Sequence, residues 1–201
     1  MNDTTLAASG RFLEIESLEA GLDDIRQAPK DFGTLELIVR RPETERREVV
    51  EEATLDLASG LLGDNWKSRG SSKTPDGSAN PELQITVMSS RVIALVARDK
   101  QFWPLAGDQL FVDLDLSTSN LPPGTQLAIG SAMIEVTAHP HTGCHKFAAR
   151  FGPGATKFVN SSLGRQLQLR GLNAKIVKSG VVRVGDAVKK LPPSSAETSR
   201  T

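Results

Sequence analysis

Two short apolar runs joined by a Gly-Ser pair make up the stretch 127-LAIGSAMIEVT-137. A two-residue linker of this kind favours a tight turn, so the stretch predicts a β-hairpin with strands at 127–129 and 132–137. The second strand leads directly into the segment 139-HPHTGCHKF-147. Because loops held by a rigid sheet often carry functional residues, we expect the hairpin to position a site in that segment.

The segment 139–145 contains every cysteine and histidine of the protein. These residues are one cysteine, Cys144, and three histidines, His139, His141 and His145. Both residue types supply nucleophiles, soft metal ligands and proton carriers that titrate near neutral pH. Cys144 is therefore the candidate nucleophile, sulfur carrier or metal ligand, and His139 and His141 are the candidate catalytic groups beside it.

Three other interpretations of this segment stay open. A free cysteine is among the most often buried residues, so Cys144 can instead be an inert core residue. A zinc site would need a ligand from elsewhere, because His145 directly follows Cys144 and the chain has no Cys-x-x-Cys pair. A Cys–His hydrolase would have to take its base from the local histidines.

Elsewhere the sequence predicts short strands separated by long connections. Strands are expected at 34–40, 48–57, 83–88, 109–116, 174–177 and 181–184, the last two as a hairpin around Ser179-Gly180. Helical segments are expected at 12–25, 57–62, 89–100, 147–151 and 155–162, and a long loop is expected at 63–81. The pattern predicts a mostly β protein with helical decorations, an α+β fold built around a single barrel.

The length of 201 residues fits one domain with modest tails. We expect an N-terminal tail and helix at 1–32, the domain at 33–190 and a tail at 191–201, with disorder at 1–9 and 192–201. A single cysteine excludes an internal disulfide. Because no run approaches the ~20 apolar residues of a membrane span, we expect a cytoplasmic protein without a membrane segment.

The net charge of zero hides an uneven distribution of charged residues. Residues 1–135 contain 13 Lys and Arg against 22 Asp and Glu, whereas residues 136–185 contain eight basic residues and no acid. The basic segment favours an anionic ligand, unless its cations pair with the acids earlier in the chain. The absence of tyrosine and the presence of only two tryptophans argue against a single-stranded nucleic acid as the partner.

A series of short motifs resembles the MOSC domain, a family named for the C-terminal domain of molybdenum-cofactor sulfurases. The motifs are Leu-Ala-Gly-Asp-Gln-Leu at 105–110, Asp-Leu-Asp-Leu-Ser at 113–117, Asn-Leu-Pro at 120–122, His-Pro-His-Thr-Gly-Cys at 139–144 and Arg-Gly-Leu-Asn-Ala at 170–174. The resemblance covers about residues 33–190 and is greatest to stand-alone bacterial members. It implies a β-barrel-like fold.

The resemblance also implies a functional role for Cys144. In the family this cysteine is proposed to carry sulfur as a persulfide. In relatives that hold the molybdenum cofactor (molybdopterin) and reduce N-hydroxylated compounds, it is proposed to bind molybdenum. The pterin carries a phosphate and is an anion, so we expect Lys146, Arg150 and Arg170 to contact it. Asn120, from the Asn-Leu-Pro motif, is assigned to the same cofactor-binding set.

We expect the chain to lack the pyridoxal-phosphate desulfurase domain of the sulfurases and the separate N-terminal barrel of the longer reductases. Pyridoxal phosphate is therefore expected only on a partner, and a cysteine desulfurase or a molybdoenzyme is the implied partner. Three functions stay open. They are the handling of molybdenum cofactor or sulfur through Cys144, a molybdenum-dependent reduction of N-hydroxylated small molecules, and a non-catalytic module whose basic face docks an acidic partner.

Overall fold

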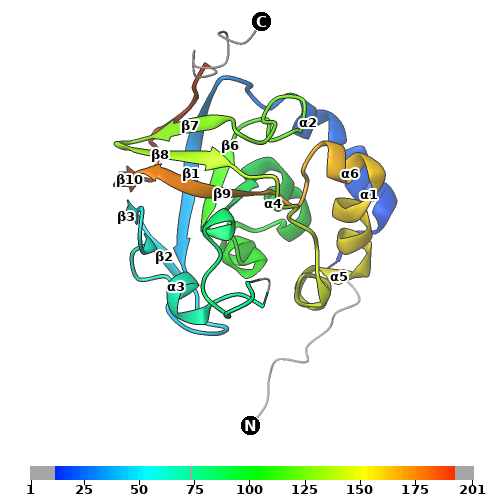
Figure 1. The fold of residues 1–201 in the computed structure, drawn as a ribbon. Helices are drawn as coiled ribbons and strands as arrows, with labels where there is room; N and C mark the ends of the chain where they lie inside the picture. The colour runs from blue at the N-terminus through cyan, green and yellow to red at the C-terminus, as the bar shows by residue number, and fades with distance from the viewer. Residues whose placement is uncertain (1–11, 73, 193–201) are drawn as a thin grey trace, which may run out of the picture.

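Seven strands close into a barrel in the computed structural model, which describes residues 12–72 and 74–192. The strands follow the order β11, β7, β8, β9, β5, β6, β1, and β11 pairs back with β1 to close the circle (Figure 1). Their bounds are β1 Phe32–Arg40, β5 Ile85–Ser89, β6 Leu110–Asp113, β7 Gln126–Ile129, β8 Ala132–Val136, β9 Leu172–Lys178 and β11 Ala187–Lys190. The predicted α+β class and barrel are confirmed.

The predicted hairpin at 127–137 is confirmed as β7 and β8. The two strands are antiparallel, with Leu127 opposite Ile134 and Ile129 opposite Ala132. Gly130 in the turn has a φ of 55°, a left-handed conformation that glycine adopts without steric cost. The hairpin forms one wall of the barrel, and its second strand runs toward the Cys/His segment as expected.

A smaller three-stranded sheet lies beside the barrel in the order β10, β3, β4. Its strands are β3 Glu52–Asp56, β4 Gly60–Leu61 and β10 Gly180–Arg183, and a further strand, β2 Glu48–Val50, pairs with β1. The hairpin predicted between 174–177 and 181–184 is wrong. Although β9 and β10 are consecutive, β9 pairs with β5 and β8, whereas β10 pairs with β3.

The helical turn predicted at 57–62 is also wrong. The carboxylate of Asp56 accepts hydrogen bonds from the backbone N–H groups of Ala58 and Ser59, which fixes a turn there. The chain then folds back so that Gly60 lies opposite Asp56 in a β3–β4 hairpin. A local side-chain to backbone hydrogen bond has therefore overridden the apolar pattern that suggested a helix.

Other predicted elements are right in type but differ in extent. The strand expected at 48–57 is divided into β2 and β3, the helix expected at 12–25 is divided at Gly21, the strand expected at 109–116 ends at Asp113, and the loop expected at 63–81 contains a short helix. The strand β11 was not anticipated. The disorder predicted for 1–9, and for all of the C-terminal tail except Pro192, lies outside the described residues.

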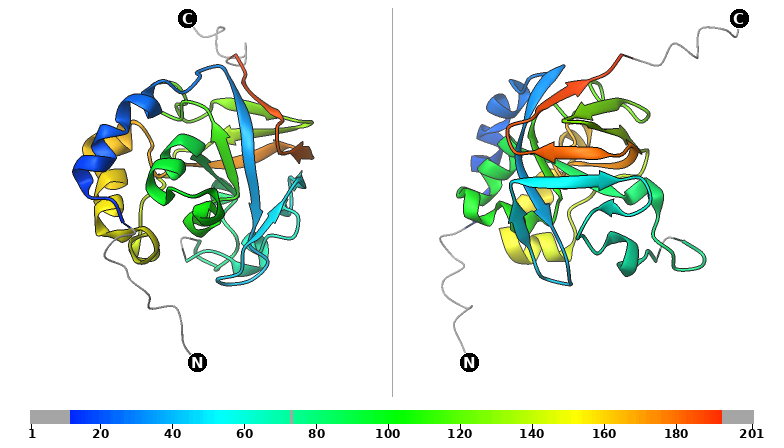
Figure 2. Two further views of the ribbon diagram at one scale, coloured as in Figure 1. Left: turned by 180° about the vertical axis from the view of Figure 1, so that it is seen from behind. Right: turned by 90° about the vertical axis from the view of Figure 1, so that its left-hand side faces the viewer.

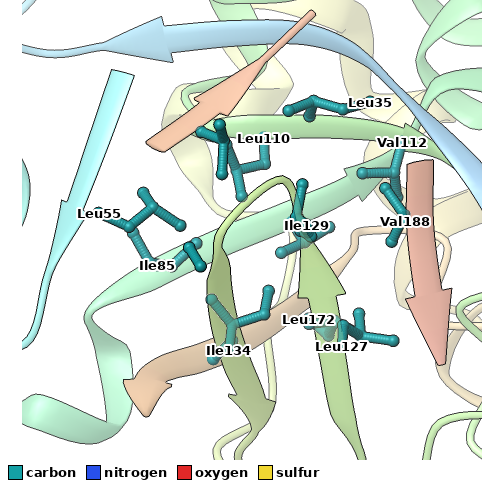
Figure 3. Packing of buried hydrophobic residues seen from close by; sticks show 14 of the residues in the cluster. Leu35, Leu55, Ile85, Leu110, Val112, Leu127, Ile129, Ile134, Leu172 and Val188 are labelled. Carbon is teal, nitrogen blue, oxygen red and sulfur yellow. The ribbon is translucent and has the colours of Figure 1, made fainter. Parts of the chain in front are cut away.

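The barrel interior is filled by aliphatic side chains (Figure 3). On β8 every second residue is buried, as expected for a strand with one face in a core. In β1 a register shift between Leu35 and Leu37 interrupts this alternation. As a result, Leu35 and Ile38 both lie in the barrel core, whereas Leu37 and Val39 contribute to a second core outside it.

Helices cover the side of the barrel on which this second core lies (Figure 2). These helices are α1 Ile15–Ala20, α2 Leu22–Arg26, α4 Ser90–Ala97, α5 His145–Asn160 and α6 Ser162–Gln166, with the 3-10 segment η3 Lys100–Ala106. Two further segments lie apart from the second core: α3 Trp66–Arg69, which contacts β4, and the 3-10 segment η2 Pro81–Leu83, which contacts β9. The predicted break in α5 is confirmed at Gly152, where φ is 88° and ψ is 161°. Among the described residues, no helix is long and apolar enough to cross a membrane.

Closure of the barrel by β11 predicts a difference between two valines. Val188 on β11 is 0% exposed and lies in the barrel core, whereas Val49 on β2 is 51% exposed. Val188→Ala should lower the free energy of unfolding by about 2 kcal/mol, because it removes buried methyl groups and leaves a cavity. Val49→Ala, the matched control, should change it by less than about 0.5 kcal/mol. Urea denaturation measures both, and equal effects would contradict the closed barrel.

Candidate functional site

Cys144 lies at the junction between the loop that leaves β8 and the first turn of α5. It occupies the N-cap position in an extended conformation, with φ of −111° and ψ of −179°, and it is exposed. Partial burial acts to raise the pKa of the thiol, but backbone N–H groups of Phe147 and Lys146 and the charge of Arg170 outweigh it and lower the pKa. The site therefore favours a reactive, accessible thiolate, and the inert core interpretation is wrong.

Two asparagines hold the loop that carries Cys144. The side chain of Asn160 accepts a hydrogen bond from the N–H of Gly143 and donates one to its carbonyl oxygen, both at 2.9 Å. Asn173 on β9 donates to the carbonyl oxygen of His139 at 3.1 Å. A Cβ atom at Gly143 would lie 3.0 Å from a methyl group of Val159, so the loop packs closely on the far end of α5. Both ends of the segment 139–143, which leads into Cys144, are thereby held.

A buried ion pair lies beneath this loop. Asp108 is fully buried, and its carboxylate accepts a hydrogen bond from the guanidinium of Arg170 at 2.7 Å. The other carboxylate oxygen of Asp108 lies 3.5 Å from Nδ1 of His141. Burial raises the pKa of Asp108, and the nearby Arg170 opposes that shift. Arg170 also lies over the ring of Phe147 at 5.0 Å, which joins the pair to the first turn of α5.

The segment just before Asp108 is held by three arginines. Its consecutive carbonyl oxygens each accept a hydrogen bond from a different guanidinium: Leu105 from Arg150 at 2.9 Å, Ala106 from Arg170 at 3.0 Å and Gly107 from Arg41 at 2.8 Å. Because a guanidinium keeps its charge at any relevant pH, these bonds fix three positive charges around one short stretch of main chain.

Two further cations, Arg47 and Lys146, complete what we call the basic cluster, namely Arg41, Arg47, Lys146, Arg150 and Arg170. A Cβ placed on Gly107 would lie 3.8 Å from Arg47 and 3.9 Å from Arg150. Burial and the positive charges of Arg150 and Arg41 lower the pKa of Arg47. Its buried Nε has no hydrogen-bond partner among the residues that the structure describes. The basic cluster therefore has at least one N–H donor, Arg47 Nε, that makes no hydrogen bond within the described residues.

Three acids partly neutralise the basic cluster. They are Asp108 with Arg170, Asp64 with Arg41 at 2.8 Å, and Glu45 with both Lys146 and Arg150. The Lys146 and Arg150 partners hold the pKa of Glu45 at about 2. Five cations against three carboxylates leave a positive local field.

The structure brings together most of the residues predicted for the site. Cys144, His141, Lys146, Arg150 and Arg170 all lie in or against the start of α5 or the segment around Asp108. Arg170 is only 6% exposed, so it acts on the thiol through its charge.

His139 lines a hollow of about 190 Å³ together with His141, Thr142, Arg165 and Gln168.

Asn120 has contacts of a different kind. Its side-chain amide donates to the carbonyl oxygens of Lys30 and Asp115 at 2.9 and 2.7 Å and accepts from Lys190 at 2.8 Å. These bonds tie β11 to the connection before β1 and to the chain after β6. They give Asn120 a structural role, and its assignment to the cofactor-binding set stays a prediction.

The alternative interpretation of the basic segment 136–185 is correct for most of it. Five of its eight basic residues pair with acids from the first 135 residues: Lys146 and Arg150 with Glu45, Arg170 with Asp108, Lys175 with Glu82 and Glu135, and Arg183 with Glu52. Because Arg41 is paired with Asp64, the positive field at the site depends on Arg47 and on the sharing of one carboxylate, Glu45, by Lys146 and Arg150. Arg41 and Arg47 come from the acidic half of the chain and were not anticipated.

Asp64 and Asp108 were also missed, although the sequence contained a signal. Both follow a glycine, and a Gly-Asp pair by itself indicates only a turn. Gly63 and Gly107 do have positive φ values of 85° and 87°. In each case the turn also directs the aspartate inward to a buried ion pair with an arginine. Among residues 12–72 and 74–192, no group of three or more His, Cys, Asp or Glu could hold a metal ion.

The model of the MOSC domain family matches residues 79–189, and the chain belongs to that family. The fold is similar to that of the YuaD protein from Bacillus subtilis, with a TM-score of 0.56 and 16% identity over 79% of this chain and 95% of that one. It is also similar to YiiM from Escherichia coli, with a TM-score of 0.51 and 17% identity over 79% of this chain and 70% of that one. No curated protein matches the chain.

The lowered pKa of Cys144 predicts alkylation at unusually low pH. In the folded protein, the rate of reaction with iodoacetamide should reach half its maximum below the pH of about 8.5 that is ordinary for cysteine. The same chain unfolded in urea should return to about 8.5, because the backbone N–H groups and Arg170 no longer surround the sulfur. Intact mass measured against time and pH tests this, and identical midpoints in the two states would contradict it.

The two hydrogen bonds between Asn160 and Gly143 predict a local effect of Asn160→Ala. Loss of both hydrogen bonds should accelerate amide hydrogen exchange in residues 143–147 by about tenfold, because about 1.4 kcal/mol of local stabilisation is lost. It should also raise the pKa of Cys144, since the N–H groups facing the sulfur lose their alignment. Asn160→Asp keeps the acceptor for the Gly143 N–H and should give a smaller change. Unaltered exchange in Asn160→Ala would show that these two hydrogen bonds do not stabilise the loop.

Proposed function

We propose that this MOSC protein binds the molybdenum cofactor, with the sulfur of Cys144 as ligand to molybdenum and the basic cluster as receptor for the cofactor's phosphate. One observation carries the proposal: an exposed thiol of lowered pKa lies at the start of the same helix that presents Lys146 and Arg150. A thiolate suits a soft metal, and guanidinium and ammonium groups suit a phosphate.

The residues present fit such a group. Cys144 supplies a sulfur ligand that is already stabilised as the thiolate by two backbone N–H groups. Arg47 supplies a buried Nε with no partner among the described residues, a donor still available to an anion nearby. When bound, the cofactor would supply a redox-active metal centre. The chain would hold the thiolate in place and neutralise the phosphate.

Proton transfer at this site is assigned to the histidines of the loop. Nδ1 of His141 lies 3.5 Å from the buried carboxylate of Asp108, which would orient the ring. His139 has its backbone carbonyl fixed by Asn173 and lines the adjacent hollow. In a reduction of N-hydroxylated small molecules, His141 would deliver the proton and His139 would contact the substrate.

Exposure of Cys144 favours a second candidate, sulfur carriage. A partner cysteine desulfurase, which would hold the pyridoxal phosphate, would present a cysteine persulfide. The Cys144 thiolate would attack its outer sulfur, so that the partner's S–S bond breaks, a persulfide forms on Cys144 and the partner leaves as a thiolate. The charge of the persulfide anion would lie on its outer sulfur, one bond beyond the atom that the backbone N–H groups of Lys146 and Phe147 face.

Metal content and intact mass separate these functions. Protein expressed in a host with an active cofactor pathway should carry molybdenum and pterin fluorescence, and Cys144→Ser should lose the molybdenum. Arg150→Gln should retain about tenfold less pterin, because a charge-assisted hydrogen bond is lost. Lys157→Gln, an exposed position on the same helix, is the matched control and should retain it fully.

Other outcomes would redirect the proposal. A mass increase of one sulfur atom on Cys144 without molybdenum would establish the persulfide carrier. Reduction of an N-hydroxylated base by an artificial electron donor, lost in Cys144→Ala, would establish the reductase. Binding of an acidic protein that Arg150→Glu abolishes and Cys144→Ser leaves intact would establish the docking module. Wild-type protein with neither molybdenum, pterin nor added sulfur contradicts both cofactor and sulfur handling.

A further inference from the structure

Glu45 lies in the β1–β2 loop, residues 41–47, in an uncommon backbone conformation. Its φ is 64°, in the left-handed region that non-glycine residues seldom adopt. From there its carboxylate reaches α5, where it binds Lys146 Nζ at 2.9 Å and the guanidinium of Arg150. Glu45 is 101 positions from Lys146 and 105 positions from Arg150 in sequence. Ion pairs to α5 therefore accompany a disfavoured loop conformation.

The cations that meet Glu45 offer more donors than one carboxylate can use. Arg150 is fixed by the carbonyl oxygen of Leu105, and its side chain is only 17% exposed. Arg47 approaches the same place in front of Gly107, and its buried Nε has no partner in the part of the chain that the structure describes. Glu45 is itself 56% exposed, so the carboxylate can leave this place without disturbing the core.

We infer that Arg47, Lys146 and Arg150 form a binding site for a phosphate-type oxyanion, and that Glu45 occupies this site until the ligand displaces it. The inference rests on the anion-binding part of the proposed function and adds an internal competitor to it. A phosphate group carries more charge and more acceptor oxygens than a carboxylate, so it can use the donors that Glu45 leaves unsatisfied.

Competition, rather than protonation, would have to release Glu45. Because Lys146 and Arg150 hold the pKa of Glu45 at about 2, the carboxylate stays charged at any physiological pH. A ligand must therefore displace a fully ionised group, and its apparent affinity falls in proportion to the fraction of molecules in which the site is open. Anions that engage only one cation would not compete, which gives the site selectivity for polyvalent oxyanions.

Pyrophosphate binding to the purified full-length protein tests the inference. Calorimetric titration at constant ionic strength should show that Glu45→Gln binds pyrophosphate about threefold to tenfold more tightly than wild type, because a half-exposed ion pair no longer competes. Glu43→Gln removes the same charge from the same loop, but Glu43 faces Arg46 rather than α5, so its affinity should equal that of wild type. In wild type, pyrophosphate should also accelerate amide hydrogen exchange in residues 43–47.

Each other outcome overturns the inference. Equal affinity of wild type and Glu45→Gln would mean that the carboxylate does not occupy the site, and weaker binding by Glu45→Gln would mean that it organises the cations instead. An equal gain in pyrophosphate affinity in Glu45→Gln and Glu43→Gln would mean that the effect comes from the change in net charge alone. If wild type, Glu45→Gln and Glu43→Gln all fail to bind pyrophosphate, the proposed oxyanion site does not exist. These results are independent of the metal and sulfur content of Cys144, so failure here and failure of the proposed function are distinguishable.

Discussion

The buried ion pair between Asp108 and Arg170 is the interaction on which the rest of the structure depends. It joins the start of β6 to the chain just before β9, and Arg170 extends it to the ring of Phe147 at the start of α5. Removing either charge would leave the other buried without its main partner, at a cost of about 3–5 kcal/mol. The barrel, the covering helices and the cysteine loop are thereby held in one arrangement.

Main-chain atoms do much of the positioning around that pair. Arg41, Arg150 and Arg170 are oriented by three consecutive carbonyl oxygens, and the Cys144 sulfur is stabilised by two N–H groups at the start of α5. Both arrangements follow from backbone geometry that the barrel fixes, namely the turn before β6 and the exit from β8. The chemistry of the candidate site is therefore a consequence of where two strands begin and end.

Local patterns in the sequence predicted the parts of this arrangement that depend on local interactions. The Gly130-Ser131 hairpin, the break in α5 at Gly152 and the Cys/His segment could all be found from a few neighbouring residues. The strand β11 could not, because only Val188 in it is buried and its partners are far away in sequence. The pairing of β10 with β3 and the approach of Arg47 to Arg150 are likewise set by long-range closure, on which local periodicity carries no information.

Cys144 at the N-cap of α5 has a consequence for how such a protein can diversify. Its thiolate is stabilised by peptide N–H groups, which every residue except proline provides, whereas the side chain of Lys146 projects separately toward Glu45. The backbone N–H of Lys146 thus contributes to the acidity of the thiol, whereas its side-chain ammonium group supplies charge that meets a ligand. Substitutions at such a position can alter what is recognised while the reactive atom keeps its character.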